Sequence, residues 1–294
     1  MSLSGLLVID KPAGMTSHDV VARLRKILKT RRIGHGGTLD PMATGLLIIG
    51  VEAGTKALQF ISAASKTYEA TICLGIATDT DDADGNVTTT VSASTVDDAH
   101  IESALAAMVG EISQVPSSVS AIKVDGRRAY DLVRSGAGVE LKPRTVTISD
   151  IVIHDIRRSA ETISIDVTVV CSSGTYIRAI ARDLGTALSV GGHLTRLRRT
   201  HCSGFTLDDA RSLDEADMTP IPLRQALARF LTEIVVTRDE VPKVLNGLNL
   251  PWRWSDSARP VMVTAEGTET LLAIGQQSEG RLTYFSVFNH SLAD

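Results

Sequence analysis

Cysteine is scarce in this sequence, which has three among 294 residues, at Cys73, Cys171 and Cys202. Because their wide separation gives no metal-ligand spacing, they argue against a zinc ribbon and against a disulfide framework. No apolar run approaches the length of about 20 residues that a membrane-spanning helix needs. The apolar stretch at residues 6–9 is too short for a signal peptide, and no basic segment precedes it. We therefore expect a protein of the cytoplasm with no membrane partner.

A strong net charge is also missing, since the formal charge is −4, with 22% charged and 43% hydrophobic residues. This balance is ordinary for a globular protein, and the length allows a sizeable core and more than one domain. The basic residues are nonetheless unevenly spread, which matters more for nucleic-acid binding than the total does. Residues 20–39 contain six Lys and Arg side chains and no acidic residue. Two further basic clusters lie at residues 123–144 and 193–201.

The patterns of apolar residues predict an α+β protein with a mixed, largely antiparallel sheet flanked by helices. Ser17 is the expected N-cap of the first helix, and Ile27 lies on its predicted buried face. The other expected helices lie at residues 55–64, 97–108, 127–135, 174–188 and 223–231. Strands are expected at residues 5–10, 46–50, 67–76, 146–157, 161–171 and 194–201.

Two prolines, Pro220 and Pro222, mark an expected linker region, so the chain is predicted to form two domains. The first covers residues 1–232 and contains a polar, basic excursion at about residues 116–145. The second, at residues 235–294, has short β-like runs, both tryptophans and many turn residues. We therefore predict a small C-terminal β domain.

The segment at residues 34–45 is the most informative part of the chain, because its twelve residues include four glycines and a single carboxylate, Asp40. Dense glycine indicates unusual backbone conformations or a close approach by another group. Pro41 restricts Asp40 to extended or turn conformations, and a buried strand follows at once. Asp40 is therefore either a catalytic carboxylate on a fixed loop or a residue that caps a turn. His35, in the same segment, has the simpler alternative of bonding the loop backbone.

Three other residues are candidates for chemistry. Tyr176 and Arg178 lie where a helix is expected to begin, a position where the helix dipole does not favour an arginine. The alternative for Arg178 is a solvated charge. Tyr68 begins a predicted strand in a chain with 4% aromatic residues, and its alternative is an ordinary core or edge tyrosine.

The aspartate-rich run at residues 79–84 invites comparison with a calcium-binding loop. When Gly85 is aligned with the glycine of an EF-hand, Thr80 and Val91 occupy the places that need Asp and Glu. We therefore interpret the run as an exposed turn that could contain one functional Asp. The sequence also has no Walker motif, no metalloprotease His pair and no spacing that assembles a nucleophilic triad, so no metal site is expected.

Six short segments, taken in order, carry a family resemblance. They are Asp-Lys-Pro-x-Gly at 10–14, the glycine-rich segment at 34–45, Lys-x-Tyr at 66–68, the Asp run with its glycine at 79–85, Gly-Thr-Tyr-Ile-Arg at 174–178 and Leu-Arg-Arg at 197–199. With these segments the chain resembles the TruB-type tRNA pseudouridine synthases over about residues 4–205. The tail from residue 235 resembles the family's PUA-like domain only loosely.

The resemblance implies the pseudouridine synthase fold and a reaction on uridine 55 in the T-loop of tRNA, without a cofactor. In this reaction the C1′–N1 bond breaks and C1′ rejoins the base at C5. Asp40 matches the essential carboxylate, which either attacks the sugar or removes a proton from it. Arg178 matches the residue that pairs with this carboxylate, and Tyr68 matches the one that stacks on the target base.

The resemblance also implies a set of binding residues and a partner. Tyr176 lines the base pocket, and His35 helps to hold a flipped-out nucleotide. Lys11, Leu197 and Arg198 are expected to contact the substrate. The partner is the T-arm of tRNA, and no protein partner is required. Basic residues expected to contact the RNA backbone are Arg23, Arg31, Arg32, Lys123, Arg127 and Arg128. The resemblance also implies that the excursion at about residues 116–145 is the family's RNA-gripping insertion.

Three alternatives remain open from the sequence. The chain could be the catalytic subunit of an RNA-guided pseudouridylation particle, although the excursion at 116–145 favours a stand-alone enzyme. It could bind or refold tRNA without catalysis, with Asp40 in a structural role. It could also be a small-molecule hydrolase that uses Asp40 in a phosphate site, and a metal-dependent version would lose activity in EDTA.

Overall fold

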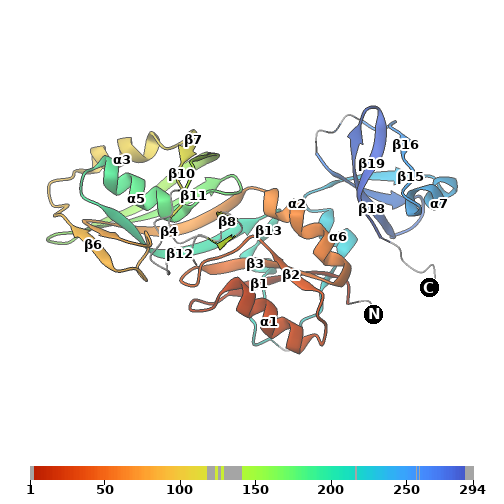
Figure 1. The fold of residues 1–294 in the computed structure, drawn as a ribbon, viewed down its shortest axis with the longest axis horizontal. Helices are drawn as coiled ribbons and strands as arrows, with labels where there is room; N and C mark the ends of the chain where they lie inside the picture. Colours follow the sequence, from red (N-terminus) through yellow and green to blue (C-terminus); the bar gives the residue numbers. More distant parts are fainter. Residues whose placement is uncertain are drawn as a thin grey trace.

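The computed structural model describes residues 3–117, 123–124, 127–128, 141–215, 217–255, 257 and 259–288. A ten-stranded sheet forms the larger part of it (Figure 1). Its strands are β1 (Gly5–Lys11), β2 (Ile33–Gly36), β3 (Thr44–Val51), β4 (Lys66–Leu74), β7 (Gly110–Gln114), β10 (Arg144–Arg158), β11 (Ile163–Cys171), β12 (Gly192–Cys202), β13 (Phe205–Thr206) and β14 (Ile221–Pro222).

The main path of this sheet runs in the order β14, β1, β3, β12, β4, β11, β10, β7, and β2 and β13 pair with β3 and β12. All of these pairs are antiparallel except β3 with β12. That parallel contact is short, joining Thr44 to Arg198 and Gly45 to Arg199. We call it the seam, because it joins the part of the sheet around β1 and β3 to the part around β4 and β11. The predicted mixed, largely antiparallel sheet with flanking helices is confirmed.

Helices cover both faces of the sheet around β1 and β3. On one face lies α1 (Ser17–Ile27). Farther along the sheet, α3 (Asp98–Ala106) packs against β10 and α5 (Ile177–Ala187) packs against β12 and β4 (Figure 1). The apolar residues of all three helices share a core with Leu7 and Ile49. On the other face α2 (Leu58–Ala63) and α6 (Leu223–Leu227) share a core with Leu6 and Ile48. Because β1 and β3 are buried on both faces, their sequences are continuously apolar rather than alternating.

The N-cap of the first helix lies one residue earlier than the sequence predicts. Thr16 is the N-cap, in a capping box with Asp19. Ser17 lies inside the helix and bonds Leu39 instead, accepting from its N–H at 2.9 Å and donating to its carbonyl at 3.1 Å. Ile27, predicted to be buried, is 42% exposed because it lies in the last turn, beyond the core.

Several other element boundaries differ from the prediction. The helix expected at 55–64 is divided into the 3₁₀ turn η1 (Glu52–Ala57) and α2, and the one expected at 223–231 ends with α6 at Leu227. The expected helix at 127–135 begins on residues that form a strand, since β9 (Arg127–Arg128) pairs with β8 (Lys123–Val124). The rest of that helix, and most of the excursion, lies outside the described residues.

The aspartate run at 79–84 forms the predicted turn, but only Asp79, Ala83 and Asp84 are exposed. It connects β5 (Ile76–Thr78) to β6 (Val87–Thr90), and Asp81 and Asp82 are only 7% and 5% exposed. The cause is a tertiary contact, because Asp82 forms a β-bridge with Leu194 of β12. Among the residues that the structure describes, no group of three or more His, Cys, Asp or Glu side chains could hold a metal ion.

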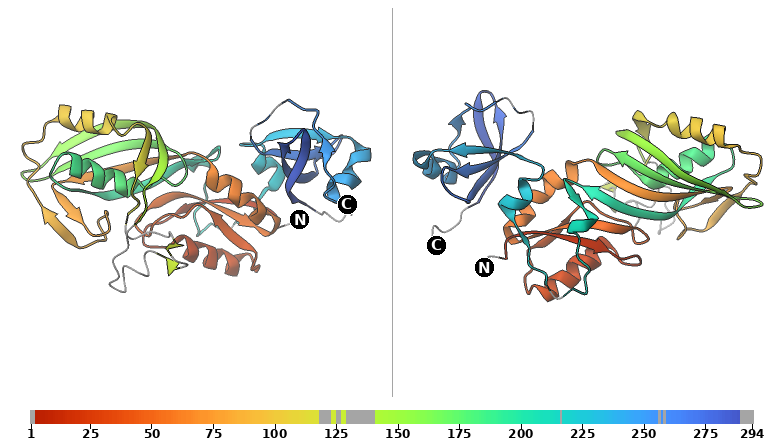
Figure 2. Two further views of the ribbon diagram at one scale, coloured as in Figure 1. Left: turned by 45° about the horizontal axis from the view of Figure 1, so that its top comes forward. Right: turned by 180° about the vertical axis from the view of Figure 1, so that it is seen from behind.

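The C-terminal part forms a separate curled sheet with the order β15, β17, β18, β19, β16. These strands span Thr232–Val236, Val261–Ala265, Leu271–Ser278, Arg281–Val287 and Leu250–Pro251, in that order, and α7 (Val241–Leu245) lies beside them. The first strand crosses the predicted boundary between residues 232 and 235. In Figures 1 and 2 this sheet lies next to α2 and α6. Within the described ranges, none of the helices combines the length and apolar character of a membrane span.

Candidate active site

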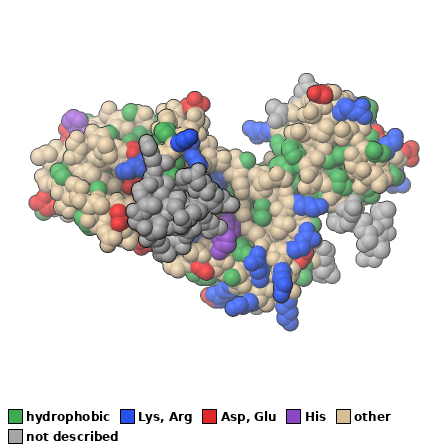
Figure 3. Space-filling view, in the orientation of Figure 1, with side chains coloured by type: hydrophobic (Ala, Val, Ile, Leu, Met, Phe, Trp, Pro, Cys, Tyr) green, Lys and Arg blue, Asp and Glu red, His purple; other side chains and the backbone are tan. Residues whose placement is uncertain are grey.

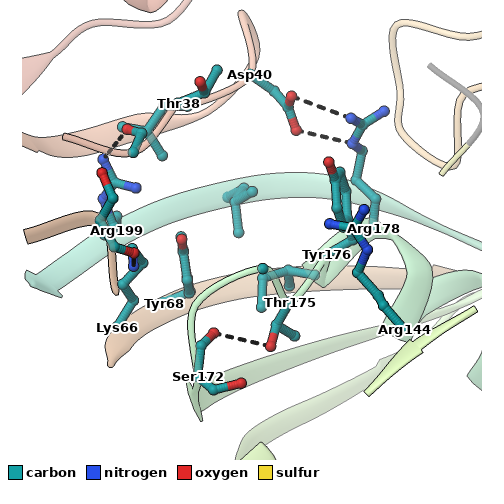
Figure 4. A pocket seen from close by; sticks show the side chains of 16 residues that line it. Thr38, Asp40, Lys66, Tyr68, Arg144, Ser172, Thr175, Tyr176, Arg178 and Arg199 are labelled. Carbon is teal, nitrogen blue, oxygen red and sulfur yellow. Dashed lines mark hydrogen bonds and ion pairs between the residues drawn. The ribbon is translucent and has the colours of Figure 1, made fainter. Parts of the chain in front are cut away.

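A pocket of about 250 Å³ opens at the seam (Figure 4). The loop at residues 37–40 forms one wall, and residues of β4 and β12 form the floor. The segment at 172–178, which ends in the first turn of α5, forms the opposite wall. The pocket therefore draws on segments from both sides of the seam, although they lie far apart in the sequence.

The loop that carries Asp40 is fixed by contacts at both ends. Lys11, whose residue surface is 0% exposed, donates to the carbonyls of Met15 at 2.7 Å and Pro41 at 3.3 Å. After the loop, Gly45 has φ +97, and a Cβ on it would lie 2.3 Å from the carbonyl oxygen of Arg199. Only glycine permits this backbone conformation together with so close an approach of β3 to β12. The predicted close approach at the glycines thus occurs at the seam.

Asp40 forms a two-point ion pair with Arg178. Its Oδ2 lies 2.9 Å from Nε, and its Oδ1 accepts from Nη2 at 3.2 Å (Figure 4). Arg178 is 3% exposed, and its Nη1 reaches the Thr80 carbonyl at 2.9 Å and Asp82 Oδ2 at 3.2 Å. The guanidinium therefore bridges two carboxylates. The position of this arginine at the start of α5 is explained by the ion pairs rather than by the helix dipole.

The environment of Asp40 has opposing effects on its charge. Burial raises the pKa of the carboxyl, the Arg178 guanidinium opposes this rise, and the nearby Asp82 carboxylate adds to it. Asp40 is nevertheless in reach of the pocket, since a third of its side chain remains exposed (33%). A carboxylate that is partly buried, paired with a cation and still accessible is suited to react with a bound molecule.

The structure places Tyr68, Tyr176 and Leu197 around the same pocket as Asp40. Tyr68 is 7% exposed on β4, and burial raises the pKa of its hydroxyl. Tyr176 precedes α5 as its N-cap residue, and its backbone is held by Gln114, which accepts from its N–H at 2.8 Å and donates to its carbonyl at 3.1 Å. The two rings and Leu197 give the pocket an apolar surface that suits a flat ring. Their individual roles stay predictions.

Arg199, and not the predicted Arg198, lines the pocket. Arg198 lies away from the pocket lining and pairs with Asp10, its Nη2 2.7 Å from Oδ2 and its Nη1 3.0 Å from Oδ1. Arg199 lines the pocket together with Leu197. Side chains alternate along a strand, so residues 197 and 199 share one face of β12 and residue 198 takes the other. Applied to the sequence, this alternation predicts that Arg199 lies on the same face of the strand as Leu197.

Two further pocket residues, Lys66 and Arg144, were not singled out from the sequence. Lys66, at the start of β4, donates to the carbonyls of Ser62 at 3.0 Å and Ala64 at 2.8 Å. Arg144, at the start of β10, is exposed at the rim. The family motif includes Lys66 only as the residue two places before Tyr68, and period-two alternation puts both on the same face of β4.

Lys11 and His35 lie apart from the pocket lining. The ammonium of Lys11 is enclosed by loop carbonyls, and burial lowers its pKa to about 8, so it fixes the loop rather than contacting substrate in this conformation. His35 lies on β2, edge-on to His18 with ring centroids 5.1 Å apart. Burial lowers the pKa of His35 to about 4, so the ring is neutral near pH 7. Its buried Nδ1 has no hydrogen-bond partner within the described part of the chain.

The residues expected to contact RNA phosphates fall into three groups. Arg31 and Arg32 are exposed between α1 and β2, with Arg32 Nε in a loose ion pair 3.8 Å from Glu52 Oε2, and Lys and Arg side chains gather over this part of the surface (Figure 3). Arg23 is occupied by an ion pair with Asp214. The side chains of Lys123, Arg127 and Arg128 lie outside what the structure describes.

Comparison with known proteins agrees with this arrangement. The family model for the N-terminal domain of the TruB family of pseudouridylate synthases matches residues 25–177. This chain belongs to the TruB family. It is 54% identical to tRNA pseudouridine synthase B of Corynebacterium aurimucosum over 247 residues, 83% of either protein. It is 58% identical to the same enzyme of Mycobacterium avium over 220 residues, which cover 75% of this chain and 71% of the relative.

A solved structure shares the fold. The similar chain comes from an H/ACA ribonucleoprotein bound to a substrate RNA containing 2′-deoxyuridine, with a TM-score of 0.71 and 24% identity. The match covers 98% of this chain and 86% of the other. At that identity the likeness establishes the pseudouridine synthase fold alone. The TruB membership rests on the sequence relatives.

Proposed function

We propose that this protein converts uridine 55 in the T-loop of tRNA to pseudouridine. The observation that carries the proposal is the Asp40–Arg178 ion pair facing Tyr68 across one pocket. The TruB-family relatives named tRNA pseudouridine synthase B support tRNA as the substrate. The product is an isomer of the substrate, so the reaction consumes no oxidant, reductant or second substrate.

In the proposed reaction, Asp40 acts on the ribose of the target nucleotide. It either attacks C1′ or removes a proton from the sugar, and both tasks require the ionised carboxylate. Arg178 favours that form, because a cation at 2.9 Å opposes the effect of burial on the pKa of Asp40. Tyr68 stacks on the base, and its hydroxyl is a candidate acceptor for the C5 proton.

The target uridine must leave the folded elbow of tRNA before it can enter a pocket of this kind. Enzymes that act on a base generally extract it from its stack and hold it against aromatic or apolar side chains. Tyr68, Tyr176 and Leu197 supply such surfaces here. The exposed Arg31 and Arg32 are suited to phosphate contacts that position the RNA without reading its sequence. Because extraction opens the elbow, we also propose that binding assists tRNA folding.

The proposed enzyme acts alone in the cytoplasm, without a guide RNA or a protein partner. The test is to incubate the purified protein with unmodified tRNA transcript and map pseudouridine by nucleotide position. We expect a single modified site at position 55 with no other macromolecule present. Product that forms only after a guide RNA is added would support the RNA-guided alternative. Loss of activity in EDTA would point instead to metal-dependent chemistry.

A further inference from the structure

The pocket carries more positive than negative charge. Of the described side chains that line it, Lys66, Arg144, Arg178 and Arg199 are cationic, and Asp40 is the one carboxylate. Arg178 already bridges Asp40 and Asp82. Lys66 and Arg199 have no such carboxylate among the described residues. Their hydrogen bonds go to backbone carbonyls, and Arg199 also bonds the Tyr68 hydroxyl. This part of the pocket is therefore suited to bind an anionic group.

Lys66 and Arg199 are also deeply buried, at 6% and 1% exposed. Both lie close to the loop glycine Gly37, since a Cβ built there would be 3.5 Å from Arg199 Nη1 and 3.5 Å from Lys66 Cε. Burying two neighbouring cations without an anion is unfavourable. Burial and the nearby Arg199 charge accordingly lower the pKa of Lys66. A bound group that brings negative charge would relieve this cost.

The position of the pair indicates which part of a nucleotide it would meet. Lys66 and Tyr68 share one face of β4, and the guanidinium of Arg199 lies 6.0 Å from the centre of the Tyr68 ring. In Figure 4, Lys66, Tyr68 and Arg199 lie together on the side of the pocket away from Arg178. If the sugar lies at Asp40 and the base on Tyr68, an edge of the base points to Lys66 and Arg199. An RNA phosphate is expected instead at the solvent-exposed rim, where Arg144 lies.

The chemistry of the proposed reaction gives that base edge a negative charge. When C1′–N1 breaks, its electron pair stays on N1 and spreads over the uracil ring to O2 and O4. This holds whether Asp40 attacks C1′ or removes a sugar proton. When C5 then forms the bond to C1′, either the bond from Asp40 to C1′ breaks or the sugar regains the proton that Asp40 removed. The C5 proton leaves and N1 takes up a proton, so the atoms and electrons balance without a co-reactant.

We propose that Lys66 and Arg199 form a cationic wall that binds the edge of the detached uracil and stabilises its negative charge. The proposal rests on the proposed function, and it deepens it by naming two residues that act on the base rather than on the sugar. Hydrogen-bond donors held in a buried site stabilise developing charge well, because they need little reorganisation during the reaction.

The test removes each charge and then restores it. Lys66→Met and Arg199→Gln are compared with the charge-retaining Lys66→Arg and Arg199→Lys. Arg157→Gln is the control, because it removes an exposed charge from β10, where Arg157 pairs with Asp155 and Asp166. Tritium release from tRNA that carries [5-³H]uridine is measured in single turnover at saturating enzyme. The dissociation constant for tRNA is measured in an Asp40→Asn background.

We expect each neutral variant to lower the single-turnover rate by about 10²–10³-fold. We expect tRNA affinity to stay within about threefold, and the charge-retaining variants to recover most of the rate. A defect that disappears at saturating enzyme, with weaker tRNA binding, would assign the pair to a phosphate instead. Equal defects in neutral and charge-retaining variants would assign it to packing. If the wild type itself releases no tritium, the proposed function fails rather than this inference.

A second measurement compares two target bases, uridine and 5-fluorouridine, on the same protein variant. Fluorine at C5 withdraws electrons and makes the detached base a more stable anion. With 5-fluorouridine at the target position, the loss of glycosidic cleavage caused by Arg199→Gln should be smaller than with uridine. Mass spectrometry of the digested nucleosides measures the cleavage. An equal loss with both bases would contradict a role in stabilising charge on the base.

Discussion

At the scale of single residues, the site consists of charges that the fold places against one another. Burial raises the pKa of Asp40, and Arg178 limits this rise while it also contacts Asp82. The ion pair between Asp40 and Arg178 was predictable from the sequence, through the family motif. The position of Asp82 beside this pair was not predictable, because the burial of Asp82 depends on a β-bridge to Leu194, more than a hundred residues away.

Removing the Arg178 charge should move the acid limb of the pH–rate profile. Because Arg178 lowers the pKa of Asp40, the Arg178→Ala variant should need a higher pH to ionise that carboxyl. Single-turnover rates measured from about pH 5 to 9 should therefore show a lower maximum and an acid limb displaced upward. The tRNA dissociation constant should change little. Weaker binding with an unmoved acid limb would remove Arg178 from the chemistry.

Replacing Tyr68 separates stacking from proton transfer. Tyr68→Phe keeps the ring, which is 7% exposed on the pocket floor, and deletes the hydroxyl. We expect tRNA affinity to be retained and turnover to fall by about 10²–10⁴-fold, the usual contribution of a positioned general base. Wild-type turnover in this variant would exclude Tyr68 as the acceptor of the C5 proton.

At the scale of elements, the seam between β3 and β12 brings the two walls of the pocket together. The strands themselves were predictable from apolar runs, because β3 is buried on both faces and β11 alternates. Their pairing was not, since the parallel contact involves only two residue pairs and depends on how close the backbones can come.

The prediction that Arg198 rather than Arg199 contacts the substrate was wrong for a different reason. The residue type was correct, but the face of the strand was not considered.

A methyl group at Gly45 tests the close approach at the seam. Gly45→Ala would put a Cβ 2.3 Å from the carbonyl oxygen of Arg199, on a backbone with φ +97. Gly110→Ala is the matched control, with φ +113 and nothing within 4 Å of the added Cβ. The control should cost about 1–3 kcal/mol of backbone strain. Gly45→Ala should cost about 1–3 kcal/mol more for overpacking, together with a loss of turnover.

The two free energies of unfolding are measured by urea titration, beside single-turnover rates for the same proteins. If both variants lose the same stability, the seam does not need a glycine for its close packing. If Gly45→Ala is the less stable variant but turns over at the wild-type rate, the seam does not position the catalytic loop.

At the scale of the whole molecule, the sheet with its helices and the C-terminal β domain form a surface on which charge is unevenly distributed. The two parts are in contact, because Lys56 donates to the Val287 carbonyl at 2.7 Å and Phe60 packs edge-on against Phe285. The net charge of −4 does not reveal the exposed arginines beside α1, but the sequence cluster at residues 20–39 did. The RNA-gripping role of the excursion at 116–145 remains a prediction.

Salt dependence should test the phosphate contacts of the exposed arginines. The double variant Arg31→Gln with Arg32→Gln should bind tRNA more weakly, and the slope of log affinity against log salt should fall by about one for each phosphate interaction removed. Arg157→Gln should leave that slope unchanged, because its arginine already pairs with Asp155 and Asp166. A slope that is the same in all three proteins would exclude Arg31 and Arg32 from the RNA interface.

The central claim is that Asp40 performs the chemistry while the rest of the pocket binds the nucleotide. The most direct measurement compares the wild type with Asp40→Asn on unmodified tRNA, mapping pseudouridine by position and measuring tRNA affinity in parallel. The wild type should modify position 55 without cofactor or guide, and Asp40→Asn should form no pseudouridine while binding tRNA about as tightly. Pseudouridine formed by Asp40→Asn at a rate near that of the wild type would contradict the claim.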